Sequence, residues 1–163
     1  SPARRGQLAR RRTGPLAALL RHTERSGVVQ EHDQILVEDI PGVGLFKFRA
    51  GGFFQLNSSI LPAFTGRIVE LAVGPWCSGD GSPGVLVDIY CGVGLFSIAG
   101  GNFVERTFGI EVDPAAVALA QSNASLNGVR GASFLAADAA DGLRRVAPQA
   151  PPERSVAVVD PPR

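Results

Sequence analysis

The second half of the chain alternates short apolar runs with longer segments of mixed polarity. Four runs have the length and composition of buried strands: residues 85–89, 107–112, 133–136 and 156–159. Three segments between them have the length and end signals of helices: residues 95–99, 114–127 and 139–146. Asp113 can cap the second of these helices, and Gly128 can end it. Buried strands separated by helices predict the α/β class, with a parallel sheet covered by helices on both faces.

The preceding region predicts a pair of antiparallel strands. The stretches QILVEDI and LFKFRA have strand character, and Pro41 and Gly42 suit a turn between them. The second stretch alternates between two faces: Leu45, Lys47 and Arg49 on one, and Phe46 and Phe48 on the other. We interpret these strands as a hairpin, or as the end of a small β-rich unit.

A helix is expected after these strands. Apolar side chains recur there at helical spacing: Ile60, Phe64, Ile68 and Leu71. Asn57 or Ser58 can cap this helix, and Pro62 falls in its first turn, where the missing N–H is tolerated. A loop containing Gly, Pro and Ser is expected over residues 74–84.

Acidic residues lie at or beside the carboxyl end of every predicted parallel strand: Asp88, Glu111, Asp138 and Asp160. Open parallel sheets bind their ligands outside the carboxyl ends of the strands, so these side chains are expected to surround a ligand. The first strand also runs into the loop YCGVG. Gly92 and Gly94 of this loop would let the backbone approach a ligand without a Cβ in the way.

This loop differs from that of a dinucleotide site. Ser97 stands at the third position of the G-x-G-x-x-G motif, and four carboxylates would repel a pyrophosphate. A ligand with a cationic centre, an amino group and a ribose diol suits them, and S-adenosyl-L-methionine has all three. Glu111 stands 23 residues after Asp88, near the spacing at which an acid binds ribose hydroxyls in nucleotide-binding βαβ units. The loop and the acids therefore predict a site for this sulfonium nucleoside.

Other roles stay open for several of these residues. Asp113 and Asp138 can be helix caps instead of ligands. Tyr90 can be a core residue, although its place at a strand end favours contact with a cofactor. Cys91 has the character of a small buried apolar residue more than that of a nucleophile.

The composition indicates a globular chain, with 45% apolar residues and a mean hydropathy of +0.13. No apolar run approaches the roughly 20 residues that a membrane-spanning helix needs. Cys77 and Cys91 form no disulfide framework and favour an intracellular location, whose compartment stays open. With two histidines besides them, no structural metal site is expected.

Charge is unevenly distributed along the chain. The net charge is +1, but the first 25 residues contain seven arginines and one acid. A transit peptide, a solvated charged segment and a contact to an RNA backbone all fit this start. The chain contains no methionine, and we interpret it as a piece of a longer protein.

Five stretches together resemble the RNA uracil-C5 methyltransferase family, in particular its fungal tRNA branch. They are LLRHT, GGFFQLNSSILPAFT, VDIYCGVGLFSIA, GIEVDPAAVALAQSNASLNGV and VVDPPR, in the family's order over most of residues 19–163. The combination of F-F-Q-x-N, D-x-Y-C-G-x-G and D-P-P-R is specific, because generic methyltransferases lack its first and last parts together. The resemblance implies a Rossmann-like class I methyltransferase sheet with the first four of its seven strands, the fourth left as an unpaired edge.

The resemblance also implies roles for single residues. Four side chains match cofactor-contacting positions of the family: Gln55, Tyr90, Glu111 and Asp160. Asp138 falls where a polar residue near the adenine is expected, and Asp88, Gly92 and Gly94 complete the expected S-adenosyl-L-methionine site. Leu95 stands where some bacterial relatives have a polar contact, so no cofactor bond is expected from its side chain.

Two regions are expected. Residues 1–52 would form a basic, flexible start and a β-rich hairpin segment, and residues 53–163 an incomplete S-adenosyl-L-methionine-binding methyltransferase domain.

The family's reaction needs two further groups. A cysteine thiolate adds to C6 of the uracil so that C5 takes the methyl group, and a carboxylate base then removes the C5 proton. In relatives the cysteine lies in an S-C-N motif downstream of D-P-P-R, with the base nearer the C-terminus. The resemblance therefore implies methylation of a T-loop uridine of tRNA by the intact protein, while these 163 residues alone are expected to be inactive.

Two other functions stay open. The target of methylation could be cytosine C5 or an amino group, although Arg163 stands where amino-methylating enzymes have an aromatic residue after D-P-P. A non-catalytic module that binds the cofactor or RNA also fits the residues present. The sequence makes no prediction of the oligomeric state.

Overall fold

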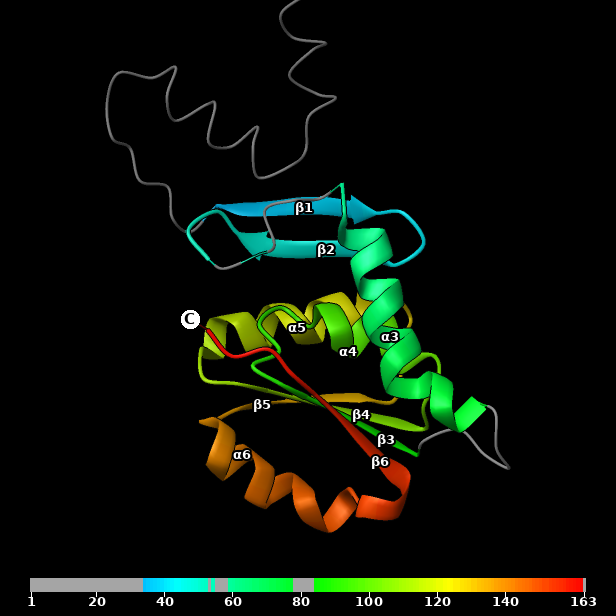
Figure 1. The fold of residues 1–163 in the computed structure, drawn as a ribbon. Helices are drawn as coiled ribbons and strands as arrows, with labels where there is room; N and C mark the ends of the chain where they lie inside the picture. The colour runs from blue at the N-terminus through cyan, green and yellow to red at the C-terminus, as the bar shows by residue number, and fades with distance from the viewer. Residues whose placement is uncertain (1–33, 53, 55–58, 78–83, 163) are drawn as a thin grey trace, which may run out of the picture.

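The computed structural model describes residues 34–52, 54, 59–77 and 84–162, without the side chains of 75–77 (Figure 1). The arginine-rich start, Gln55, and the candidate caps Asn57 and Ser58 lie outside the described residues. Within the described ranges, none of the helices combines the length and the apolar character that a bilayer span requires.

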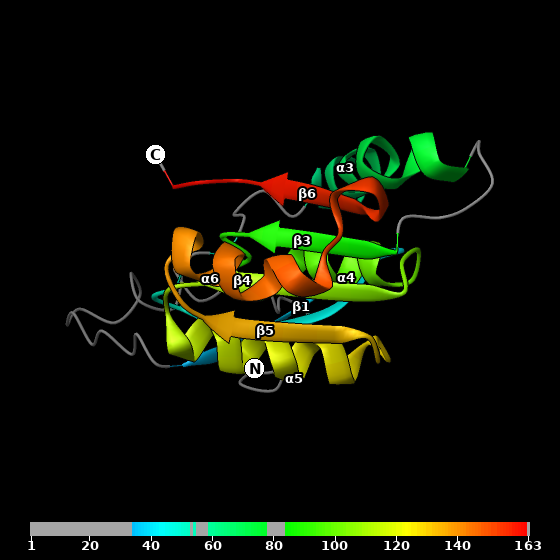
Figure 2. The same ribbon diagram turned by 90° about the horizontal axis from the view of Figure 1, so that it is seen from below.

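The centre of the fold is a four-stranded parallel sheet. Its strands are β3 (Val85–Ile89), β4 (Arg106–Glu111), β5 (Ala132–Ala136) and β6 (Ser155–Val159). They pair in the order β5-β4-β3-β6, which confirms the predicted parallel α/β sheet. Strand β3 lies between β4 and β6, and all five of its residues are buried. In Figure 2 the arrowheads of β3, β5 and β6 point the same way, so their carboxyl ends lie at one edge.

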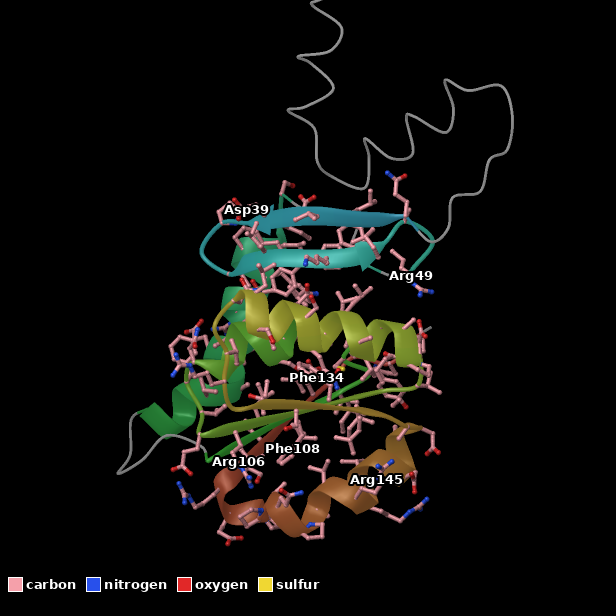
Figure 3. All side chains as sticks on the ribbon, turned by 180° about the vertical axis from the view of Figure 1, so that it is seen from behind. Asp39, Arg49, Arg106, Phe108, Phe134 and Arg145 are labelled. Atoms are coloured by element: carbon pink, nitrogen blue, oxygen red, sulfur yellow. The ribbon has the colours of Figure 1, made fainter. Side chains whose placement is uncertain are left out.

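Helices cover both faces of this sheet, as predicted. They are α3 (Leu61–Cys77), α4 (Leu95–Gly101), α5 (Pro114–Leu126) and α6 (Ala139–Val146), with the short 3-10 turns η1 (Ala147–Gln149) and η2 (Pro152–Arg154) after α6. Helices α3, α4 and α5 lie on one side of the sheet and α6 on the other (Figure 1). Phe134 packs in the larger core beneath α5, and Phe108 packs in the smaller core on the α6 side (Figure 3).

The predicted helix caps are confirmed. Oδ1 of Asp113 accepts a hydrogen bond from the N–H of Ala115 at 2.8 Å and starts α5. Asp138 starts α6 by accepting from the N–H of Asp141 at 2.9 Å. Gly128, with φ of 71°, follows the last residues of α5 in the left-handed conformation that ends many helices.

A hairpin of β1 (Ile35–Ile40) and β2 (Gly44–Arg49) lies over α4 and α5 (Figure 1). The predicted alternation is confirmed, since Phe46 and Phe48 are 0% and 2% exposed and Leu45 is 40% exposed. Phe48 stacks on Phe54 with 4.3 Å between ring centroids. The hairpin and the sheet share one hydrophobic core, and the division at residue 52 stays a prediction.

Helix α3 differs from its prediction in two respects. Three of the four residues expected on its apolar face are exposed: Ile60, Phe64 and Leu71. The buried face is set by Leu61, Thr65 and Val73 instead, because the main contacts of α3 are with α4 and the edge strand β6. The helix also continues to Cys77, three residues beyond Gly74, where a loop was expected. The buried Val73 anchors this end by tertiary packing, which overrides the poor helix propensity of Gly74.

Candidate functional site

A pocket of about 350 Å³ opens at the carboxyl edge of the sheet. It is formed by the ends of β3, β4 and β5 and by the start of α6, and it is lined by Tyr90, Ile110, Glu111, Val112, Ala137, Asp138, Ala139 and Ala140. The lining includes three of the predicted site residues: Tyr90, Glu111 and Asp138. Among the described residues, no lysine or arginine lines this pocket, and the formal charges of this described lining are two carboxylates.

The loop after β3 has an unusual backbone. Tyr90, Gly92 and Gly94 have φ values of 68°, 52° and 89°. Tyr90 is the one residue other than glycine with a positive φ among the described residues, and such a conformation costs about 1–3 kcal/mol. The N–H groups of Tyr90 and Cys91 both donate to the carbonyl of Ile110, at 2.9 and 3.0 Å, and hold the turn. The left-handed turn leaves Tyr90 40% exposed in the pocket wall, so it is not a core residue.

Glycine is required at position 94 by the space around it as well as by its positive φ. A Cβ at this position would lie 3.2 Å from a ring carbon of Phe134 and 3.3 Å from the methyl of Ala120. The loop therefore packs tightly against Phe134 of β5 and Ala120 of α5. At Gly92, by contrast, a Cβ would meet nothing within 4 Å, so only its φ favours glycine.

Glu111 ties the loop to the next strand. Its Oε2 accepts from the N–H of Gly92 and its Oε1 accepts from the N–H of Asp113, both at 3.0 Å. Each carboxylate oxygen has two lone pairs, so both can accept a further hydrogen bond. The carboxylate is thus held in a fixed position in the pocket wall, with capacity left for donors from a ligand.

Asp88 lies beneath the loop and does not line the pocket. It is 1% exposed, and its Oδ2 accepts from both the N–H and the hydroxyl of Ser97, at 2.8 and 2.6 Å. Burial raises the pKa of Asp88 to about 6, against the hydrogen bonds from Ser97 that lower it, and the charges of Asp160 and Glu111 raise it further. Since α4 has no side-chain cap at Gly94, Asp88 serves as the acceptor for its first turn.

Ser97 has a structural role that the sequence pattern did not predict. In the sequence it is notable only as the residue in place of the third glycine of G-x-G-x-x-G. Its hydroxyl is fully buried on Asp88, and the signal that could have found it is a hydroxyl residue three positions after Gly94, in the first turn of the helix above a buried acid.

Asp138 and Asp160 take different positions at the sheet edge. Asp138 both caps α6 and lines the pocket, so the two roles left open for it occur together. Asp160 follows β6, and its N–H donates to the carbonyl of Ile89 at 3.4 Å. It is exposed and lies outside the lining of the pocket, yet close enough for its charge to act on Asp88. Gln55 lies outside the described residues.

Cys91 is unsuited to attack a substrate. Its side chain is 6% exposed and belongs to the larger core. Burial raises the pKa of its thiol, and the charges of Asp88 and Glu111 raise it further, so the thiolate is strongly disfavoured. The thiol instead contacts the carbonyl of Gly92 at 3.7 Å.

Comparison with solved structures defines the class of the fold. A Pyrococcus abyssi tRNA (uracil-54, C5)-methyltransferase, solved in complex with S-adenosyl-L-homocysteine, matches 65% of this chain and 24% of its own with a TM-score of 0.52 and 24% identity. Methanocaldococcus jannaschii TYW2 in complex with AdoMet matches 69% of this chain and 47% of its own, with a TM-score of 0.52 and 19% identity. The sheet and its covering helices have the class I methyltransferase fold.

Sequence comparison identifies the family. The model of the tRNA (uracil-5-)-methyltransferase family matches residues 32–144, and the chain belongs to this family. A tRNA (uracil(54)-C(5))-methyltransferase of Saccharomyces cerevisiae is 37% identical over 130 residues, covering 80% of this chain and 20% of the yeast protein. The enzyme of the same name from Schizosaccharomyces pombe is 35% identical over 137 residues, covering 83% and 25%. The chain thus spans a fifth to a quarter of the length of these relatives.

Proposed function

We propose that this chain is the S-adenosyl-L-methionine-binding part of an enzyme that methylates C5 of a uridine in tRNA. The observation that carries the proposal is the carboxylate of Glu111, which is fixed in the wall of the pocket by the N–H groups of Gly92 and Asp113. A fixed acceptor in a pocket whose described lining holds carboxylates and no cations suits a nucleoside with a free ribose diol and no phosphate.

The residues of the pocket fit this cofactor. Glu111 would accept hydrogen bonds from the ribose hydroxyls, and Asp138 would accept from the adenine amino group. Val112 and Tyr90, 68% and 40% exposed, offer apolar surface for the adenosine. The carboxylates favour the positive charge of the sulfonium, with Asp160 contributing from outside the pocket. The cofactor supplies the methyl group when it is bound.

Family membership supports tRNA as the partner. The family model is described by its tRNA uracil-5 activity, and the two fungal relatives are named for uracil 54. We therefore propose a uridine of tRNA, at the position those names give, as the substrate of the whole protein.

The nucleophile is proposed to lie outside the described residues. Cys91 is buried under the loop with a raised thiol pKa, which leaves it unable to add to a uracil ring. This chain would accordingly bind and orient the methyl donor, and another part of the intact protein would form the covalent adduct.

Deletion of the gene that encodes this chain tests the proposal in cells. Nucleoside mass spectrometry of purified tRNA should show loss of 5-methyluridine, with recovery by the wild-type gene and not by a Glu111→Gln gene. An Asp113→Asn gene is the matched control and should restore the modification. Undiminished 5-methyluridine after deletion, without a second gene of this family in the cell, would exclude the proposed substrate.

A further inference from the structure

Asn123 of α5 and Asn127, which follows the last residue of this helix as its C-cap, bind the free edge of β2 as a peptide strand would. Asn123 accepts from the N–H of Lys47 at 2.8 Å and donates to its carbonyl at 2.9 Å. Asn127 accepts from the N–H of Leu45 at 2.9 Å and donates to its carbonyl at 2.8 Å. The backbone groups of Leu45 and Lys47 that face away from β1 are therefore paired with side-chain amides, which prevents unpaired groups at the half-buried Lys47.

The spacing of the two elements explains why this match is possible. Residues four apart on a helix are separated by about 6 Å along its axis, and residues two apart on a strand by about 6.8 Å. Two asparagines one turn apart can thus each meet an alternate residue of β2. Gly44 permits the approach, because a Cβ there would clash with the amide of Asn127.

Asn123 has one contact that Asn127 lacks. Its Nδ2 also donates to the carbonyl of Val93 at 3.1 Å, in the loop between Gly92 and Gly94. The side chain is 0% exposed, and Val93 lies in the same core as Phe46 and Phe48 of the hairpin. A single buried amide therefore joins the hairpin to the glycine loop.

The loop is constrained from two sides by these contacts. Glu111 holds the N–H of Gly92 from β4, and Asn123 holds the carbonyl of Val93 from α5. Two consecutive residues of the loop are thus fixed by side chains from different elements. A shift of Lys47 relative to α5 would therefore reach Val93 through Asn123, since the same Nδ2 donates to both carbonyls.

We propose that Asn123 is a positioning residue that makes the β1–β2 hairpin part of the cofactor site, so that hairpin docking and cofactor binding are coupled. The proposal rests on the proposed function, because it takes the ligand of the loop to be S-adenosyl-L-methionine. Coupling of two events through one structural element is reciprocal, so cofactor binding should in turn tighten the hairpin.

Calorimetry with S-adenosyl-L-homocysteine tests the first direction of the coupling on the 163-residue chain. Asn123→Ala should raise the Kd about tenfold, the effect of losing roughly one buried hydrogen bond. Asn127→Ala is the matched control, because it removes an equivalent pair of hydrogen bonds to the hairpin, those to Leu45, together with its bond to the carbonyl of Asn123, without touching the loop. It should change the Kd less than about twofold. Both variants are compared at a temperature where thermal melting shows each to be folded. Equal effects of the two substitutions would overturn the proposal.

Hydrogen exchange of the wild-type chain tests the reverse direction without any variant. Saturation with S-adenosyl-L-homocysteine should slow exchange of the Lys47 amide, which donates to Asn123, and unchanged exchange would overturn the coupling. The two proposals fail differently. If the wild-type chain binds no S-adenosyl-L-homocysteine, both the cofactor assignment and the coupling are refuted. If it binds, but the two variants have equal Kd values or the exchange of the Lys47 amide is unchanged, the coupling alone is refuted.

Discussion

Ser97 donates both its backbone N–H and its hydroxyl to a single oxygen, Oδ2 of Asp88, at 2.8 and 2.6 Å. The other oxygen, Oδ1, is buried and meets no hydrogen-bond donor among the described residues. The pair joins the middle of the sheet to the first turn of α4 and so fixes the loop between them. It also places a poorly solvated carboxylate directly under the candidate site.

The raised pKa of Asp88 predicts how stability depends on pH. The folded chain holds the proton up to a pH of about 6, while the unfolded chain loses it near 3.8. Between these values the folded state binds more protons, so the contribution of Asp88 to stability is greatest below pH 3.8 and declines through pH 6. The whole decline amounts to roughly 3 kcal/mol, of which about 2 kcal/mol falls between pH 4.5 and 7.5. Asp88→Asn should remove it, as urea unfolding at pH 4.5 and 7.5 would measure.

Asp113→Asn is the matched control for this experiment. Asparagine caps a helix about as well as aspartate, and the substitution removes an acid from the same edge of the sheet. The control should keep the decline between the two pH values. An Asp88→Asn chain whose stability still falls as steeply as that of the wild type would contradict the assignment of the titration to Asp88.

Ser97→Ala should destabilise the fold, although Ser97 does not line the pocket. The hydroxyl is lost, the N–H of residue 97 remains on Asp88, and a buried acceptor loses one of its two donors. Such a loss costs about 1–3 kcal/mol. Urea unfolding at pH 7.5 measures the cost, and because the hydroxyl lowers the pKa of Asp88, the variant should lose less stability at pH 4.5. An equal loss at both pH values would count against this explanation.

Substitutions at the two loop glycines should differ in cost. Gly94→Ala adds a Cβ that is crowded by Phe134 and Ala120, and it also strains a φ of 89°. Gly92→Ala strains a φ of 52° but enters open space. We expect Gly92→Ala to cost about 1 kcal/mol, and Gly94→Ala to cost at least about 1 kcal/mol more because of its contacts. Equal melting temperatures for the two variants would disprove this packing of the loop.

The thiol of Cys91 should be unreactive in the folded chain. In a Cys77→Ser background, a maleimide reagent should modify Cys91 only after unfolding, because the side chain is buried and its pKa is raised. In the same preparation, radiolabelled S-adenosyl-L-methionine should transfer no methyl group to unmodified tRNA. Rapid labelling under native conditions, or methyl transfer above background, would refute the conclusion that Cys91 is not the nucleophile.

The sequence was sufficient for the elements whose signals are local. The buried strands, the caps Asp113 and Asp138 and the two faces of β2 follow from composition and period, which depend on a few neighbouring residues. Features that depend on packing between distant segments could not be predicted from the sequence. The apolar period of α3 does not say which of its residues pack against the rest of the fold, and three of the four residues with that period are exposed.

In the candidate site, too, features with local signals were predicted and features that depend on distant contacts were not. Glu111 and Tyr90 were expected in the wall of a pocket and lie there. Asp88 was expected among the side chains that surround the ligand, and it lies buried outside the pocket lining, because β3 is covered on both faces and its carboxylate accepts hydrogen bonds from Ser97. Asn123 carried no signal, since its partners lie 76 and 30 residues away and only the fold brings them together.

The central claim is that the carboxylate of Glu111 holds S-adenosyl-L-methionine in this pocket. The most direct measurement is a calorimetric titration of the wild-type, Glu111→Gln and Asp113→Asn chains with S-adenosyl-L-methionine. We predict saturable binding to the wild type, a Kd at least about tenfold higher for Glu111→Gln, from the loss of a charged acceptor, and little change for Asp113→Asn. Absence of binding to the wild type, or equal affinity of the Glu111→Gln chain, would contradict the claim.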